Sequence, residues 1–218
     1  MVKRRADLRS ATILNPFENR LASCRALCLM GNKELSLNKK ESQASSKQPG
    51  LTIGNELRKA LSYHQSGQFE RAGEIYAKIL KVAPFNADAL NLAGVLALEE
   101  GNLAHAEKQI AAAIAADPSR PEFYNNLGNV QARQNHLNEA ARSYQKAIAL
   151  NPDYAAAYFN LGNANQELKK YRQAIKYYCR TLEIEPELGR ALAATQVGRL
   201  LPALYADYGH EIFGHIFI

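Results

Sequence analysis

Two histidines near the C-terminal end of the chain are of the residue type that binds catalytic zinc. They frame the segment His210-Glu-Ile-Phe-Gly-His215, in which a glutamate directly follows the first histidine. The zinc-protease pattern places its two histidines four residues apart, on one face of a helix. Here they are five residues apart, so on a helix they would point about 140° away from each other. The spacing therefore argues against a zinc site, and we expect no metal and no other cofactor.

The remaining reactive residue types also lack the spacing of a catalytic site. Cys24, Cys28 and Cys179 are odd in number and have no metal-site spacing. The chain contains no phosphate-binding glycine loop, no G-x-S-x-G segment and no dinucleotide fingerprint. We therefore predict that the protein is not an enzyme. The unpaired cysteines favour a reducing compartment, and with no apolar run of about 18 residues a cytoplasmic location is expected.

The most regular feature of the sequence is a period of 34 residues. Four of the eight prolines follow one another at this distance: Pro84, Pro118, Pro152 and Pro186. Internal repeats of this length are pairs of helices that stack on their neighbours. With proline as position 32, the repeats are residues 53–86, 87–120, 121–154 and 155–188, and a partial repeat begins at residue 189.

Other positions of the repeat carry the same kind of side chain each time. Position 8 is small in every repeat: Ala60, Gly94, Gly128 and Gly162. Position 20 is alanine in every repeat: Ala72, Ala106, Ala140 and Ala174. Small residues at both positions let the two helices of a pair approach closely, while large apolar residues at positions 17, 24 and 28 recur at helical spacing and fill the seams. The tyrosines of this pattern are therefore interpreted as core residues.

These patterns predict an all-α solenoid of antiparallel helix pairs. Glycine or a polar residue at position 15 ends the first helix, and each proline ends the second. The position-15 residues are Gly67, Gly101, Asn135 and Lys169, of which the last two are less suited to a left-handed turn. The expected helices are 53–66, 69–82, 87–100, 103–116, 121–134, 137–150, 155–168 and 171–184, with a ninth over 188–200.

Small residues at positions 8 and 20, aromatic residues at position 24 and proline at position 32 resemble the tetratricopeptide repeat family over residues 53–188. Two segments are similar to the repeat array of O-linked N-acetylglucosamine transferases: Asn125-Asn-Leu-Gly-Asn129 and Phe159-Asn-Leu-Gly-Asn163. The first repeat departs from the family, because Glu56 and Lys59 replace apolar residues. Terminal repeats often have such a polar outer face.

The resemblance implies a peptide-binding surface on the first helix of each pair, through positions 2, 5, 6, 9, 12 and 13. Positions 6 and 9 of the third and fourth repeats are all asparagine. An asparagine amide offers an acceptor and two donors, which matches a peptide unit, so a column of asparagines can hold an extended main chain. The expected peptide-binding residues are Asn91, Asn125, Asn126, Asn129, Arg133, Phe159, Asn160, Asn163 and Gln166.

Two other interpretations of this surface remain open. The asparagines can simply solvate the groove, as in generic repeats of this family. The surface can also be a clamp for a C-terminal carboxylate, which needs basic residues at positions 2, 5 or 6 of successive repeats. Arg58 is the only candidate in the first two repeats, and the third has Glu122. We therefore disfavour the clamp. Phe159 is the one aromatic residue at a groove position and would hold an apolar side chain of the guest.

The chain ends differ from the repeats in composition. Residues 1–50 carry all of the net charge of +6 and are expected to be a basic, largely disordered tail. The neutral remainder argues against nucleic-acid binding. Residues 189–218 are expected to hold a partial fifth repeat or capping helix and an apolar tail. Three interpretations of this tail remain open: it folds back on the last repeat, it meets a partner, or it belongs to a domain that is absent.

The predicted function is a scaffold that binds an extended peptide segment of a partner protein. The alternative is a substrate-recruiting N-terminal fragment of a glycosyltransferase, methyltransferase or sulfotransferase.

Overall fold

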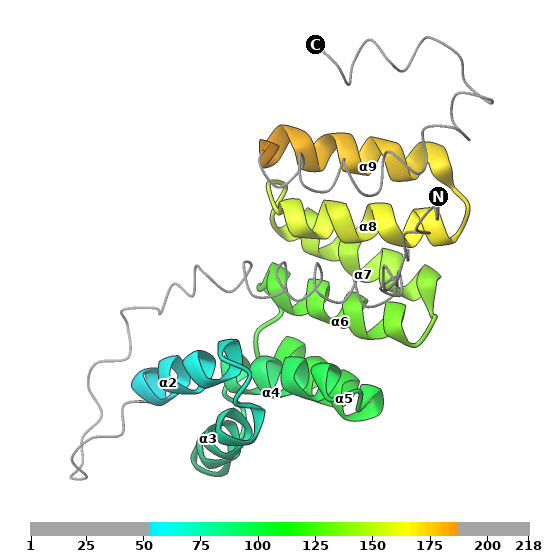
Figure 1. Cartoon of the computed structure of the whole chain (residues 1–218). Coiled ribbons are helices and arrows are strands. Elements are labelled where there is room, and N and C mark those ends of the chain that lie inside the picture. Colours follow the sequence, from blue (N-terminus) through cyan, green and yellow to red (C-terminus); the bar gives the residue numbers. More distant parts are fainter. Residues whose placement is uncertain (1–52, 187–218) are drawn as a thin grey trace, which may run out of the picture. The chain divides into compact units, whose positions relative to one another are not determined.

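The computed structural model describes residues 53–186, and these form eight helices without a strand (Figure 1). The expected tail over residues 1–50, the ninth helix over 188–200, the apolar end and the segment with His210 and His215 lie outside the described residues. The eight helices are α2 (Ile53–Gln65), α3 (Phe69–Val82), α4 (Ala87–Glu99), α5 (Leu103–Ala116), α6 (Pro121–Arg133), α7 (Leu137–Leu150), α8 (Ala155–Glu167) and α9 (Tyr171–Ile184).

The helices pack in the order expected of a solenoid of helix pairs. The two helices of each repeat contact each other, and the second helix of a repeat contacts the first helix of the next repeat. Consecutive first helices also contact each other, so α2, α4, α6 and α8 are neighbours in that order. The all-α repeat fold is therefore confirmed, and every helix boundary lies within one residue of the expected position. No helix within residues 53–186 is long and apolar enough to cross a membrane.

The same turn ends the first helix of all four repeats. Position 15 has a positive φ in each repeat, at Gly67, Gly101, Asn135 and Lys169. The next residue donates its backbone N–H to a carbonyl five residues earlier, as Lys170 does to Asn165 at 2.8 Å. This bond and the left-handed residue before it define a Schellman turn. Each first helix ends one residue before the expected position, because the residue at position 14 is the C-cap, as at Glu100, Gln134 and Leu168.

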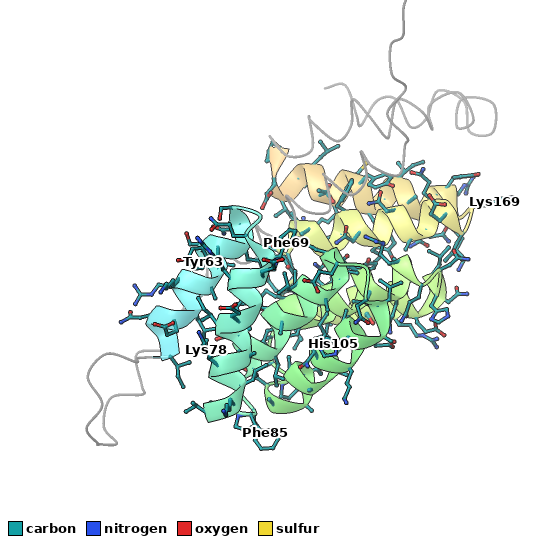
Figure 2. The ribbon with its side chains drawn as sticks, turned by 60° about the horizontal axis from the view of Figure 1, so that its bottom comes forward. Tyr63, Phe69, Lys78, Phe85, His105 and Lys169 are labelled. Carbon is teal, nitrogen blue, oxygen red and sulfur yellow. The ribbon has the colours of Figure 1, made fainter. Side chains whose placement is uncertain are left out.

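Lys169 gives a first testable prediction. Its φ of 58° is left-handed, and Figure 2 shows it at the turn between α8 and α9. The left-handed conformation costs an L-residue roughly 1–2 kcal/mol, part of which glycine offsets through its greater freedom in the unfolded chain. Lys169→Gly is expected to raise the free energy of unfolding by about 0.5–1 kcal/mol in urea denaturation. Asn135→Gly should have a smaller effect, because asparagine tolerates this conformation. A destabilised Lys169→Gly variant would contradict the argument.

The small residues at position 8 receive the large residues at position 24. A Cβ atom added to Gly128 or Gly162 would lie 2.5 Å from the Cε1 atom of Tyr144 or Tyr178, respectively. A Cβ atom on Gly94 would lie 2.5 Å from Cγ1 of Ile110. Glycine in mid-helix costs about 1 kcal/mol relative to alanine, and close ring packing at these positions offsets that cost. The same contacts place each tyrosine hydroxyl beside the first helix of its own repeat.

Candidate peptide-binding face

The expected site residues all lie on three consecutive first helices. Asn91 is on α4, four of the residues are on α6, and the other four are on α8. Because α4 contacts α6 and α6 contacts α8, the structure brings these residues together along one layer of the repeat array. We call the five buried asparagines among the expected site residues the amide network: Asn91, Asn125, Asn126, Asn129 and Asn160.

The amide network links neighbouring repeats directly. Asn126 Nδ2 donates to Asn91 Oδ1 at 2.9 Å, which joins α6 to α4. Asn160 Nδ2 donates to Asn125 Oδ1 at 3.0 Å and to Asn129 Oδ1 at 3.2 Å, which joins α8 to α6. We call the contact between two consecutive repeats a joint. In both of these joints the asparagine at position 6 of the later repeat donates to the asparagine at position 5 of the earlier one. The asparagines therefore have a role in repeat stacking that the sequence pattern did not predict.

The joint between the first two repeats uses leucines at the same two positions. Leu57 is position 5 of the first repeat and Leu92 is position 6 of the second, and both belong to one buried apolar cluster. Two apolar partners or two amide partners can each be buried at low cost, whereas one of each would leave a buried amide group unsatisfied. The pairing of positions 5 and 6 is thus matched in chemistry at every joint in the described residues.

Tyrosine hydroxyls hold the asparagines at position 9. Tyr144 donates its hydroxyl proton to Asn129 Oδ1 at 2.9 Å, and Tyr178 lies 2.8 Å from Asn163 Oδ1 and 2.9 Å from Gln166 Oε1. The sequence pattern identified these tyrosines only as core residues. Their hydroxyl contacts were missed, although the joint recurrence of Tyr at position 24 and Asn at position 9 is a signal that could have indicated them.

The members of the face differ in exposure. The five residues of the amide network are buried, and Asn163, Gln166 and Arg133 are partly exposed. Asn125 is fully buried, and its Nδ2 atom has no hydrogen-bond partner. Phe159 is 2% exposed, and its ring centroid lies 5.8 Å from that of Tyr178, so it is a packed side chain. The assignment of all nine residues to a peptide site stays a prediction.

A cluster of charges lies at the start of α6. The Arg120 guanidinium lies 3.3 Å from the Asp88 carboxylate and 3.3 Å from the Glu122 carboxylate. Burial raises the pKa of the Asp88 carboxyl, and the nearby Arg120 counteracts part of that rise. Both acids occupy position 2 of their repeats, where a carboxylate clamp would require basic residues. Arg58, the remaining clamp candidate, is exposed and donates to Asn55 Oδ1 on its own helix.

The described residues contain little that suggests catalysis. No group of three or more potential metal-ligating side chains occurs within residues 53–186. His64 is buried between Tyr76, whose hydroxyl lies 3.3 Å from its Nδ1 atom, and Glu99, whose carboxylate lies 3.4 Å from its Nε2 atom. Its ring also packs edge-on against Phe69 at 5.7 Å between centroids. These contacts fix α2 against α3 of the same repeat and against α4 of the second repeat.

Stacked helix pairs with polar side chains along their first helices define a class of protein, the helical-repeat scaffold for protein interaction. Three family models identify the particular kind of repeat. Two models described as Tetratricopeptide repeat match residues 57–121 and 155–188, and one described as TPR repeat matches residues 133–169. Together they cover more than half of the chain, so the protein belongs to the tetratricopeptide repeat family. Members of this family are generally interaction modules without catalytic activity.

Solved structures agree with this assignment. The crystal structure of MamA is 26% identical, with a TM-score of 0.56, over 69% of this chain and 90% of that chain. A mutant O-GlcNAc transferase of Thermobaculum terrenum is 28% identical, with a TM-score of 0.60, over 64% of this chain. The match covers only 27% of the transferase. No curated protein sequence matches.

A third structure contains a bound peptide. The first tetratricopeptide domain of Spaghetti (RPAP3), bound to an HSP90 peptide, matches 53% of this chain and 91% of that chain. Its identity of 23% and TM-score of 0.50 show a common fold.

Proposed function

We propose that the protein binds an extended segment of a partner polypeptide along α4, α6 and α8. The amides of this layer would hydrogen-bond to the main chain of the guest. We also propose that the chain consists of a basic tail over residues 1–50, four repeats over 51–188 and a partial repeat over 189–218. Cytoplasmic location remains a prediction.

The observation that supports this proposal most strongly is the exposure of the amides on α8. Asn163 and Gln166 are partly exposed, and their Oδ1 and Oε1 atoms lie 2.8 Å and 2.9 Å from the Tyr178 hydroxyl. Their N–H groups can therefore reach carbonyl oxygens of a guest main chain. The Nδ2 atom of Asn125, by contrast, is buried and has almost no surface that a guest could contact.

The charges of the face favour an internal segment of the guest over its C-terminal carboxylate. Asp88 and Glu122 occupy position 2 of the second and third repeats, and they already engage Arg120. A free carboxylate would meet two acidic groups that already share the Arg120 guanidinium. The peptide bound to the Spaghetti domain indicates that this fold can hold a short peptide. The partly exposed amides of Asn163 and Gln166 support contact with main-chain groups of the guest.

Peptide binding can be tested with a partly exposed member of the face. The probe is a fluorescein-labelled peptide of 12 residues with alternating serine and threonine, measured by fluorescence anisotropy with the full chain. Asn163→Ala is expected to weaken binding about two- to tenfold, because one hydrogen bond contributes about 0.5–1.5 kcal/mol. Gln145→Ala removes an exposed amide from α7 and should leave the affinity unchanged. No binding by the natural chain, or equal affinities of the chain and Asn163→Ala, would refute the proposal.

The second candidate is a substrate-recruiting part of a larger enzyme. The similarity to the repeat region of a Thermobaculum terrenum O-GlcNAc transferase favours it, because this chain corresponds to about a quarter of that protein. The test is to sequence the DNA that follows the coding region. A continuing reading frame with a transferase domain would support this candidate, and a stop codon would exclude it.

A further inference from the structure

Positions 9 and 24 change together from repeat to repeat within this chain. The third and fourth repeats combine asparagine at position 9 with tyrosine at position 24. The second repeat has Val95 and Ile110 at these positions, so both polar groups are absent. The first repeat has Leu61 and Tyr76, and there the hydroxyl lies beside His64. A buried phenol thus has a polar partner in each of the three repeats that contain it.

The rings of the two tyrosines are held in place by the backbone. The nearest ring carbons of Tyr144 and Tyr178 lie 2.5 Å from where a Cβ atom of Gly128 or Gly162 would be, and both rings are buried. The hydroxyls are therefore fixed points beside the first helix. An asparagine amide, by contrast, exchanges its donor and its acceptor when it turns over about its last side-chain bond. A hydroxyl that donates its proton favours the orientation in which the amide oxygen faces it.

We propose that Tyr178 is a positioning residue of the peptide site, an inference that rests on the proposed function. Its hydroxyl proton draws the amide oxygens of Asn163 and Gln166 toward the core. The N–H groups of these two partly exposed side chains are thereby directed to carbonyl oxygens of the guest. Tyr144 holds the oxygen of Asn129 in the same way, but Asn129 is buried and its oxygen also accepts from Asn160 Nδ2, so this second pair stabilises the stacking of the repeats.

The test removes one hydroxyl and keeps its ring. Tyr178→Phe retains the packing against Gly162 and is expected to bind the labelled serine–threonine peptide about two- to tenfold more weakly. Tyr76→Phe makes the same chemical change in the first repeat, beside His64, and should leave the affinity unchanged. Thermal melts of all variants, followed by circular dichroism, establish that each one is folded at the temperature of the binding measurement.

A triple variant separates positioning from a general structural effect. If Tyr178 acts through Asn163 and Gln166, the variant Tyr178→Phe/Asn163→Ala/Gln166→Ala should bind no more weakly than Asn163→Ala/Gln166→Ala, because the three side chains act as one unit. Additive losses, or a Tyr178→Phe variant that binds as tightly as the natural chain, would overturn this inference and leave the proposed function intact. A natural chain that does not bind the peptide would overturn both.

Discussion

Replacement of Asn126 by leucine is expected to lower the free energy of unfolding by about 1–3 kcal/mol. Asn126 Nδ2 donates to Asn91 Oδ1, and both side chains are buried. The leucine would remove the donor and leave the amide of Asn91 against an apolar side chain. An unsatisfied buried polar group of this kind costs more than the hydrogen bond itself contributes. Urea denaturation of the full chain, followed by circular dichroism at 25 °C, measures the effect.

The double variant Asn91→Leu/Asn126→Leu is the matched control for this prediction. It should recover most of the lost stability, because replacing both partners by apolar groups of similar size is nearly neutral. Leu57 and Leu92 occupy the same two positions between the first and second repeats and lie in one buried apolar cluster, so the repeat geometry can accommodate leucine at both positions. If the double variant were as unstable as Asn126→Leu, the argument from matched partners would be wrong.

Replacement of Gly128 by alanine is expected to destabilise the protein by about 1–3 kcal/mol. The new Cβ atom would lie 2.5 Å from Cε1 and 2.7 Å from Cδ1 of Tyr144. The ring cannot easily move, because it is buried and its hydroxyl is bonded to Asn129. The overpacking therefore outweighs the gain of about 1 kcal/mol that alanine brings to a helix interior. The same denaturation experiment measures the loss.

Gly73 provides a control within the same fold. It lies inside α3, and a Cβ atom there would meet only the Cδ2 atom of Leu96 at 3.2 Å. Gly73→Ala should thus change the free energy of unfolding by less than about 1 kcal/mol, since a side-chain tip yields more readily than a ring. Equal losses for Gly73→Ala and Gly128→Ala would show that helix glycines matter here for a reason other than ring packing.

The sequence was sufficient to predict the helices because their ends depend on local chemistry. Proline stops each second helix, and the residue at position 15 ends each first helix wherever a left-handed turn is needed. Lys169 illustrates the limit of that argument, because lysine is poorly suited to this conformation and yet adopts it. The hydrogen bonds of the Schellman turn are the same as in the glycine-containing repeats, so the repeat geometry overrides the preference of the residue.

The side-chain contacts of the site could not be predicted in the same way. Each link of the amide network depends on the register between two neighbouring repeats, which the period of 34 residues does not specify. The sequence therefore identified the asparagines at positions 5, 6 and 9 but not their bonds to each other. Phe159 was expected to hold an apolar side chain of a guest, whereas the structure places its ring against Tyr178. The direction of a tyrosine hydroxyl likewise depends on which first helix its ring packs against.

The change from a leucine pair at the first joint to asparagine pairs at the next two limits how the repeats can be rearranged. The second repeat carries Leu92 on the side facing its predecessor and Asn91 on the side facing its successor, so it works as an adapter. Excising it would bring Leu57 against Asn126. The third repeat has an amide at both ends, and its removal would pair Asn91 with Asn160. Gene duplication or deletion could thus vary the number of repeats that have asparagine at both positions 5 and 6. The second repeat, with leucine at position 6 and asparagine at position 5, would have to stay between the first repeat and these.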